Sequence, residues 1–463
     1  MAATETPINA LWQSAGLPAD ALAHLTLTGT EPALPSSFAV GTAAQVSFAA
    51  AALAAAEIGH RRNGLRQQVR VDMRHAALEC CSHFLIDGLA PNVWDKLAGL
   101  YECRTGWVRL HTNFAHHRDG VLRLLGLPEG TGTEREAVGQ ALTRWDATEF
   151  EQAATDAGLV VAALRRFDEW DAHPQSTAIA AQALVAIERI GDAPPLALPA
   201  LPQSDRPLAG LRVLDLTRIL AGPFCGRMLA ACGADVMLVN SPHLPNIEAI
   251  ADTSRGKLSA FADLRTASGR DALNGVLREA NVFVQGYRPG SLAALGFTPN
   301  AVAQARPGIV MVSLSAYGDT GPWAGKRGFD SLVQTATGFN HAEAQAAGTT
   351  QPRALPMQIL DMASGALMAF GAQAALLRQQ REGGSWHVRV SLARTGLWLR
   401  GLGRVGDGFS APAADFSGVM ESSASGWGEL SAIRHAAEFS HTPAGYRRAS
   451  MPPGSHPLAW PAA

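Results

Sequence analysis

The stretch that decides the fold is PLAGLRVLDLTRILAGPFCGRMLAACGADVMLV, residues 207–239. Its apolar run LRVLDLT, at 211–217, has the length and composition of a buried strand. Residues 222–232 suit a helix, and ADVMLV at 234–239 is a second apolar strand. A strand, a helix and a strand in this order predict two parallel strands joined by a covering helix.

The alternation of strands and helices continues along the chain. RTASGRDALNGVLREA, at 265–280, has the pattern of an amphipathic helix, and apolar strands are expected at 281–285 and 309–315. Strands that are buried on both faces read as continuous apolar runs. We therefore predict an α/β protein whose large domain is a parallel sheet covered on both faces.

Length, charge and cysteine content limit the possible functions. The chain has 463 residues, enough for more than one domain, and a formal net charge of −2 gives no general attraction to nucleic acid or membranes. Five cysteines without CxxC spacing indicate the reduced thiols of a cytoplasmic protein. Residues 36–56 carry no charge, but their small residues partition weakly into lipid, so a buried helix is expected there.

Composition also suggests how the chain is divided. YECRTGWVRLHTNF, at 101–114, has strand-like alternation on both sides of a Thr-Gly turn, and residues 134–190 have a helical pattern. The segment APPLALPALPQSDRP, at 193–207, has five prolines and reads as a linker. The expected units are a small α+β domain at 86–192, the linker at 193–207, the large domain at 208–400, and a loop with a closing tail at 401–463.

An internal repeat involves the start of the chain. AAEIGHRRNGLRQQVRVDM, at 55–73, aligns with ALLRQQREGGSWHVRVSL, at 375–392, so that VRV falls on VRV. Each copy has an Ala-rich helix, a basic turn with glycine and a strand, although chance similarity of two Ala-rich helices is the alternative. In this register Asp361 aligns with Thr42. We interpret residues 1–85 as a partial repeat of the central helix and strand.

Two familiar kinds of site do not fit the sequence. The turn TRILAGPFCG, at 217–226, lacks GxGxxG, and Asn240 stands where an acidic residue would follow the second strand, so NAD is not expected to bind. Three histidines, His111, His116 and His117, lack a carboxylate or cysteine at matching spacing. We interpret them as surface or packing residues and predict no metal site.

One carboxylate lies in an otherwise uncharged stretch. Asp361, in LPMQILDMASGALMAF at 355–370, is the only charged residue between Arg353 and Arg378. It is either the N-cap of a helix rich in small residues or a nucleophile. Residue patterns alone leave both possibilities open.

Basic side chains lie near the ends of several predicted strands: Arg218, Arg255, Lys257, Arg288 and Arg327. In a parallel sheet, the loops that follow the strands converge on one crevice, where ligands bind. Several cations gathered there suit a polyanion such as the phosphates of coenzyme A (CoA). The alternative for each basic residue is a solvated surface charge.

These segments resemble the class III CoA-transferases, a group that includes formyl-CoA transferase, carnitine CoA-transferase and α-methylacyl-CoA racemase. The resemblance covers about 190 residues and implies a Rossmann-like large domain with a smaller α+β domain. Residues 428–457 resemble the family's closing segment, and the small-domain-like segment stands N-terminal, which is unusual. The matching stretches of the large domain are 207–239, SRGK at 254–257, YRPGSLAALGF at 287–297, SAYGDTGPWAGKRGFDSLVQTATG at 315–338, ILDMASGALMAFGAQAALL at 359–377 and VRVSL at 388–392.

The resemblance implies a role for Asp361. In the family, the aspartate at this position attacks the carbonyl of an acyl-CoA, forms a mixed anhydride and then an aspartyl-CoA thioester, from which an acceptor acid takes CoA. The carboxylate must be ionised to attack, and we expect the helix N-terminus to keep it so. The small residues Ala363, Ser364 and Gly365 leave room for a thioester.

The resemblance also implies eight further site positions, with acyl-CoA and a carboxylic acid as substrates, no tightly bound cofactor, and a homodimer. Arg218 and Ala221 match a CoA-contacting turn, and Lys257 matches a lysine near the nucleotide. The turn against the pantetheine arm corresponds to Gly286, Tyr287 and Arg288, and pocket-lining positions correspond to Arg327 and Asp330.

Several departures from the family pattern keep alternatives open. Gly286 replaces the usual asparagine, Asn240 replaces an acidic residue, and Thr42 replaces the carboxylate of the repeat. A non-catalytic or degenerate acyl-CoA-binding subunit is therefore the alternative to an active CoA-transferase. Racemisation is disfavoured because Phe329 stands where the racemase branch has a histidine, which would remove one of the two bases needed.

Overall fold

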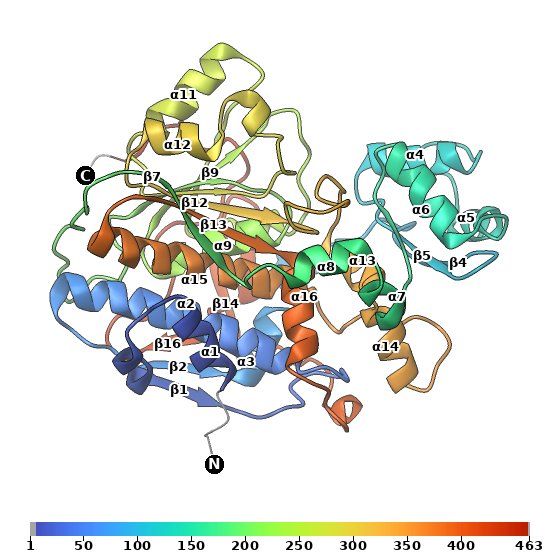
Figure 1. Cartoon of the computed structure of the whole chain (residues 1–463), viewed down its shortest axis with the longest axis horizontal. Helices are drawn as coiled ribbons and strands as arrows, with labels where there is room; N and C mark the ends of the chain where they lie inside the picture. Colours follow the sequence, from blue (N-terminus) through green and yellow to red (C-terminus); the bar gives the residue numbers. More distant parts are fainter. Residues whose placement is uncertain (1–5, 462–463) are drawn as a thin grey trace.

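The computed structural model describes residues 6–461, and its largest element is a seven-stranded sheet (Figure 1). Within these residues the strand order is β10-β9-β8-β11-β12-β13-β7, and all neighbours are parallel except β13 and β7. The predicted α/β fold class is confirmed. The strands are β7 (Ala186–Gly191), β8 (Arg212–Leu216), β9 (Asp235–Asn240), β10 (Lys257–Phe261), β11 (Val282–Gln285), β12 (Val310–Ser315) and β13 (Ser385–Ser391).

Helices cover both faces of this sheet because successive strand residues are apolar on opposite sides. In β11, Val282 and Val284 pack into one core, while Phe283 packs into the core on the other face. The helices on the first face are α9 (Ala221–Ala231) and α15 (Ile359–Glu382), and those on the second are α11 (Ala267–Leu277) and α12 (Pro299–Ala305) (Figure 1).

The order of the strands creates a crevice at one edge of the sheet. After β8 the chain builds β9 and β10 on one side, and it then crosses to build β11, β12 and β13 on the other. The loops that follow β8 and β11 therefore diverge at the point where the direction of winding reverses. These loops begin at Thr217 and Gly286, in the segments that carry Arg218 and Arg288.

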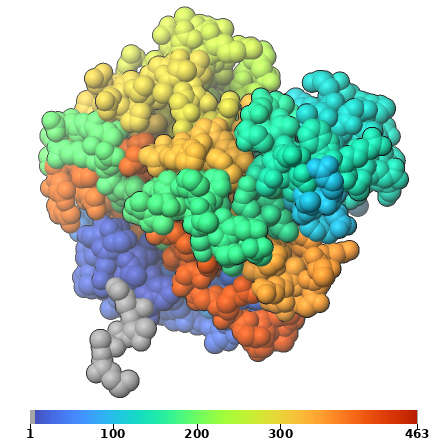
Figure 2. Space-filling view, turned by 45° about the vertical axis from the view of Figure 1, so that its right-hand side comes forward, coloured from blue at the N-terminus to red at the C-terminus, as the bar shows by residue number. Residues whose placement is uncertain are grey.

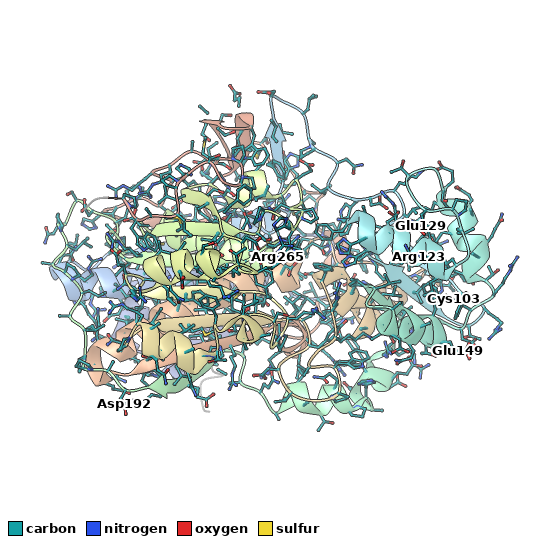
Figure 3. The ribbon with its side chains drawn as sticks, turned by 90° about the horizontal axis from the view of Figure 1, so that it is seen from above. Cys103, Arg123, Glu129, Glu149, Asp192 and Arg265 are labelled. Atoms are coloured by element: carbon teal, nitrogen blue, oxygen red, sulfur yellow. The ribbon has the colours of Figure 1, made fainter. Side chains whose placement is uncertain are left out.

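A smaller unit lies beside the large sheet and has its own apolar core, which includes Val108 and Phe150. Its antiparallel sheet has the order β4-β5-β6, and the strands on either side of Thr105 confirm the predicted hairpin. Figure 3 shows Cys103 and Arg123 in this unit, away from the large sheet. Its elements are β4 (Gly99–Glu102), β5 (Trp107–Leu110), α4 (Ala115–Leu124), α5 (Arg135–Leu142), α6 (Ala147–Asp156) and β6 (Val161–Ala163).

The helical prediction for 134–190 is correct for α5, α6, α7 (Phe167–Asp171) and α8 (Pro174–Ala180) but wrong for β6 and β7. β6 reads Val-Ala-Ala, and alanine by itself favours a helix. Pairing with β5 and full burial of all three residues override that preference.

The N-terminal segment repeats the unit formed by α15 and β13 at a constant shift of 319 positions. This shift carries α2 (Val40–Asn63) onto α15, and both helices have 24 residues. It carries Asp72, which caps α3 (Met73–Glu79), onto Ser391, which caps α16 (Leu392–Gly401). The sheet of β1 (Leu25–Thr28), β2 (Val69–Asp72) and β16 (Ala437–Phe439) also has the order and directions of β12-β13-β7.

Helices α2 and α15 pack against each other in the middle of the molecule (Figure 1). In the part of the chain that the structure describes, these two helices are long and apolar enough to cross a membrane. Their most apolar stretches are 94% and 100% buried inside the protein, which identifies both as core helices. The buried helix predicted within 36–56 is confirmed as α2.

The C-terminal segment closes on the N-terminal one. Figure 2 shows the blue N-terminal segment against orange-red residues near position 400, and Phe38 and Arg404 form a β-bridge. Strand β15 (Gly428–Ile433) pairs with β14 (Met420–Ser425) and with β3 (Phe84–Ile86). The buried Arg227 of α9 forms ion pairs with Glu79 of α3, at 2.8 Å, and with Asp252.

The remaining helices are α1 (Pro7–Ser14), α10 (Ile250–Thr253), α13 (Asp330–Ala336) and α14 (Phe339–Ala346).

A glycine permits the close approach of α9 and α15. A Cβ atom at Gly365 would collide with the carbonyl oxygen of Ala221 and lie 3.0 Å from the ring of Phe224. The backbone oxygen cannot rotate away as a side chain could. Gly365 therefore fixes the distance between these helices one turn beyond Asp361.

We expect Gly365→Ala to lower the free energy of unfolding by about 1–3 kcal/mol, because the added methyl group overpacks the contact with α9. Urea denaturation measures this change. The control is Gly275→Ala in α11, where a Cβ would have no neighbour within 4 Å. That variant should be unchanged or more stable by up to about 1 kcal/mol. Equal effects at the two positions would contradict the packing argument.

Candidate active site

Asp361 lies in the first turn of α15 at the centre of the protein. Its side chain is only 8% exposed, and among the described residues none donates a hydrogen bond to its carboxyl group. The N-cap of α15 is Gln358, so the N-cap interpretation of Asp361 is wrong. The carboxyl group is left without a structural partner, as a reactive group would be.

A second carboxyl group lies against the backbone of the first. Asp330, the first residue of α13, is fully buried, and its Oδ2 accepts a hydrogen bond of 2.9 Å from the backbone N–H of Asp361. Its Oδ1 accepts another from the side-chain amide of Gln334. The predicted pocket residue Asp330 therefore positions Asp361.

The pKa values of Asp330 and Asp361, whose carboxyl groups are buried close together, are both raised. Burial raises the pKa of Asp330 to about 7, although its hydrogen bonds and Arg109 oppose the shift. Burial also raises the pKa of Asp361 well above its ordinary value, and the neighbouring charge of Asp330 adds to this. The expectation that the helix N-terminus keeps Asp361 ionised is therefore not met, because desolvation and like-charge repulsion outweigh the helix dipole.

A cleft of about 310 Å³ opens at the crevice between the loops that follow β8 and β11. Five of the predicted site residues line it together, namely Arg218, Gly286, Tyr287, Arg288 and Arg327. Phe329, which also lines it, immediately precedes Asp330. Among the described residues that line this cleft, none is Asp or Glu, so its three arginines make it a site for an anion.

Two predicted site residues lie elsewhere. Ala221 begins α9 and contacts Gly365 through its backbone oxygen, so it supports the helix that carries Asp361. Lys257 is 0% exposed, and its Nζ donates to Asp215 Oδ2 at 2.9 Å and to the Pro223 oxygen at 2.6 Å. The predicted contact of Lys257 with a nucleotide is therefore corrected to a structural ion pair beneath α9.

The small unit contributes two histidines that the sequence predicted to be surface or packing residues. His116 and His117, from α4, line the cleft, and Arg327 donates to Nε2 of His117 at 3.3 Å. Burial, with His116 and nearby arginines, lowers the pKa of His117 to about 3, so its ring is neutral at pH 7. Only the tertiary fold brings these residues to Arg327, and no spacing in the sequence indicates it.

His111 does have the packing role that was predicted. Its ring stacks on Phe329 with centroids 4.0 Å apart, and burial lowers its pKa to about 3. Within residues 6–461 no group of three His, Cys, Asp or Glu side chains is placed to hold a metal ion.

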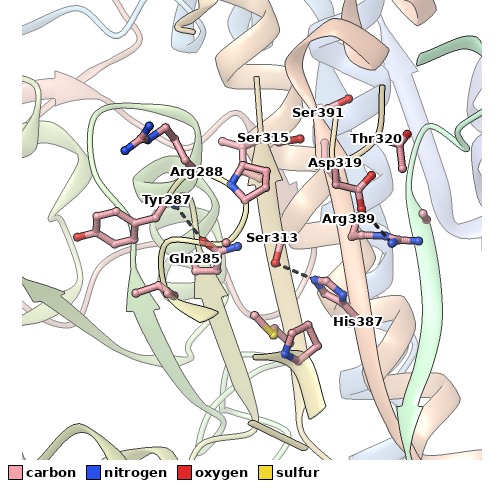
Figure 4. A pocket seen from close by; sticks show the side chains of 18 of the residues that line it. Gln285, Tyr287, Arg288, Ser313, Ser315, Asp319, Thr320, His387, Arg389 and Ser391 are labelled. Carbon is pink, nitrogen blue, oxygen red and sulfur yellow. Dashed lines mark hydrogen bonds and ion pairs between the residues drawn. The ribbon is translucent and has the colours of Figure 1, made fainter. Parts of the chain in front are cut away.

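A second cleft, of about 410 Å³, lies on the other side of the turn at 286–291 and shares Tyr287 and Arg288 with the first (Figure 4). At its floor, Ser313 and Nε2 of His387 are hydrogen-bonded at 2.8 Å. Burial lowers the pKa of His387 to about 4. At its rim, Arg389 is paired with Asp319 at 3.0 Å, so its charge is compensated, unlike the arginines of the first cleft.

Comparisons with known proteins find similarity to CoA-transferases. Residues 208–407 match the model of CoA-transferase family III. An acyl-CoA transferase of Gibberella moniliformis is 28% identical over 403 residues, covering 78% of this chain and 70% of the relative. A succinate–glutarate CoA-transferase of Agrobacterium fabrum is 32% identical over 212 residues, covering 42% of this chain and 52% of the relative.

A crystal structure of a hypothetical protein from Mycobacterium tuberculosis shares 31% identity over 42% of this chain and 58% of that chain, with a TM-score of 0.37. Apart from the relative from Gibberella moniliformis, the chain spans about half the length of the curated relatives it matches first. The matched region contains Asp361, Asp330 and the arginines of the first cleft. The similarity to CoA-transferase family III therefore extends over residues 208–407 of this chain.

Proposed function

We propose that this protein moves coenzyme A from an acyl-CoA thioester to a free carboxylic acid, with Asp361 as the nucleophile. The observation that carries the proposal is the buried carboxyl group of Asp361, which accepts no hydrogen bond from the described residues. Its backbone is bonded to Asp330, and the residue before Asp330 lines a cleft with three arginines. The similarity of residues 208–407 to CoA-transferase family III supports the same activity.

The cleft suits the phosphates of CoA. Arg218 and Arg288 follow adjacent parallel strands, and Arg327 reaches the same space from the loop before α13. Guanidinium groups bind phosphate through paired hydrogen bonds as well as charge. Burial lowers the pKa of Arg327, and repulsion from Arg288 adds to the shift, so the two cations lie close together.

The proposed chemistry proceeds through acyl derivatives of Asp361. A carboxylate oxygen of Asp361 attacks the thioester carbonyl, the carbon–sulfur bond breaks, and CoA leaves as a thiolate. The thiolate then attacks the carbonyl of Asp361 in the mixed anhydride, which releases the first acid and leaves an aspartyl-CoA thioester. The acceptor carboxylate attacks this thioester, and the same two steps run in reverse to give the new acyl-CoA and the free carboxylate of Asp361.

The site of one chain contains residues from both the large sheet and the small unit. His116 and His117 approach Arg327 from within the same chain. We propose a cytoplasmic homodimer in which each chain carries one site, since the repeat has Thr42 in place of the nucleophile.

The direct test incubates the full chain with acetyl-CoA and then with hydroxylamine, followed by peptide mass spectrometry. We expect a hydroxamate on the peptide that contains Asp361, and no adduct in Asp361→Asn. That variant should also lose at least about 10³-fold in kcat for CoA exchange, because an amide cannot form the acyl intermediate. Tight CoA binding without adduct or exchange, across a panel of acyl-CoAs, would instead favour the non-catalytic alternative.

The raised pKa values predict how activity depends on pH. Since only the ionised form of Asp361 attacks, kcat/KM should rise with pH through and above pH 7. Asp330→Asn removes the neighbouring negative charge, so the pKa of Asp361 falls and the acid limb moves to lower pH. Profiles of kcat/KM between pH 5.5 and 9 for both proteins measure this. An acid limb at the same pH in both would contradict the coupling.

The cationic cleft predicts a specific binding defect. Arg218→Gln should raise KM for acyl-CoA by about tenfold or more with little change in kcat, because a phosphate contact worth about 1.5–3 kcal/mol is lost. The dependence of KM on salt should also become weaker. Arg389→Gln, which changes the compensated arginine of the second cleft, is the control and should leave KM within twofold. A KM that responds equally to both changes would argue against phosphate binding in the first cleft.

A further inference from the structure

The loop between β12 and α13 carries two parts of the proposed site. Residues 316–329 deliver Arg327 to the cleft and end directly before Asp330. The loop has no helix or strand of its own, and its position therefore depends on what holds its backbone. Three hydrogen bonds to its backbone come from outside the large sheet, from α8.

Gln175 of α8 holds this loop with all of its polar side-chain atoms. Its side chain is 0% exposed, and Nε2 donates to the backbone oxygens of Tyr317, at 2.6 Å, and Thr320, at 2.8 Å. Its Oε1 accepts from the backbone N–H of Trp323 at 2.7 Å. One amide thus fixes three backbone groups across seven residues of the loop, and each would otherwise lack its partner.

The sequence of the loop is shaped around this contact. Gly318 and Gly321 both have φ of +85°, a conformation that suits glycine. A Cβ at Gly321 would lie 2.6 Å from Oε1 of Gln175, and one at Gly318 would lie 2.7 Å from Nε2 of Gln182. The Gly-Asp-Thr-Gly stretch at 318–321 therefore leaves room for two glutamine side chains from the segment after the small unit.

The contact reaches Arg327 through a short turn. Trp323, held by Gln175, accepts a backbone hydrogen bond of 2.9 Å from Lys326. The ammonium group of Lys326 pairs with the buried Glu151 at 2.8 Å and lies 3.8 Å from the centre of the Trp323 ring. Arg327 is the next residue, so its Cα is fixed by the turn that Gln175 anchors.

We propose that Gln175 is a positioning residue that holds Arg327 where it binds the phosphates of CoA. This inference rests on the proposed function, because it needs Arg327 to contact CoA. Gln175 itself lies outside the first cleft and acts through the backbone of the loop. If Gln175 had a purely structural role, its replacement would weaken folding, and its effect on CoA affinity would be the same with and without Arg327.

A double-mutant cycle on the full chain tests this dependence. The variants are Gln175→Leu, which keeps the volume and removes all three hydrogen bonds, Arg327→Gln, and the two combined. Isothermal titration calorimetry gives the dissociation constant for CoA. We expect each single variant to weaken binding about tenfold, and Gln175→Leu to add less than twofold when Arg327 is already replaced.

The matched control is Gln182→Leu, which removes one hydrogen bond, of 3.2 Å, to the Thr320 hydroxyl. Its CoA affinity should stay within twofold of the parent. If Gln175→Leu does not fold, Gln175→Glu gives the same cycle, because an ionised carboxylate keeps the size but cannot donate to Tyr317 and Thr320. Circular dichroism and thermal melting identify which variants are folded.

The outcomes separate the two claims. If Arg327→Gln weakens CoA binding but the loss from Gln175→Leu is tenfold in both backgrounds, Gln175 does not act through Arg327 and this inference fails alone. If CoA binding is unchanged in Gln175→Leu, this inference also fails alone. If Arg327→Gln leaves CoA affinity unchanged, the cleft assignment in the proposed function fails as well.

Discussion

The hydrogen bond from the backbone N–H of Asp361 to the buried carboxyl group of Asp330 joins the two helices that form the site. It places two acidic side chains in a volume from which water is largely excluded. Two such groups cannot both be ionised without a large cost in free energy. The geometry of the site and its acid–base behaviour therefore have one origin, and in the proposed mechanism Asp361 attacks only after the pair gives up a proton.

The rest of the fold supports this pair from several directions. On one side, α9 approaches α15 closely at Gly365, and on another, α2 packs against α15. The repeat that contains α2 has a matching hydrogen bond, because Glu31 accepts a 2.6 Å hydrogen bond from the backbone N–H of Thr42. A carboxylate thus caps both helices, but only α15 has an aspartate at the third position. The repeat therefore serves as scaffold, and the chain has one candidate nucleophile of this kind in its described part.

Much of the large domain could be predicted because its strands are apolar runs and its helices are amphipathic or bounded by glycine. The strands near 211–217, 281–285 and 309–315 lie within a residue of their predicted bounds. The cluster of Arg218, Arg288 and Arg327 followed from the rule that loops after parallel strands converge. The residue pattern around Asp361 left the N-cap and nucleophile interpretations open, and only the family resemblance favoured the nucleophile.

What could not be predicted depends on contacts between distant segments. Lys257 looks like a ligand-binding residue in sequence, yet burial beneath α9 pairs it with Asp215. His117 and Gln175 meet the loop at 316–329 only through the packing of the small unit and α8 against the large sheet. The raised pKa of Asp361 is likewise a property of its burial, which one-dimensional patterns do not contain.

The central claim, that Asp361 is acylated in each turnover, is tested most directly by following oxygen atoms. The full chain converts an acceptor acid, with both carboxyl oxygens labelled with ¹⁸O, to its CoA thioester in unlabelled water. The protein is then digested, and mass spectrometry measures the peptide that contains Asp361. The account predicts one ¹⁸O atom in the side chain of Asp361 after a single turnover and a second after repeated turnovers, because in each turnover the acceptor leaves one of its oxygens there when the anhydride is cleaved. Rapid formation of the labelled thioester with no ¹⁸O at Asp361 would contradict it.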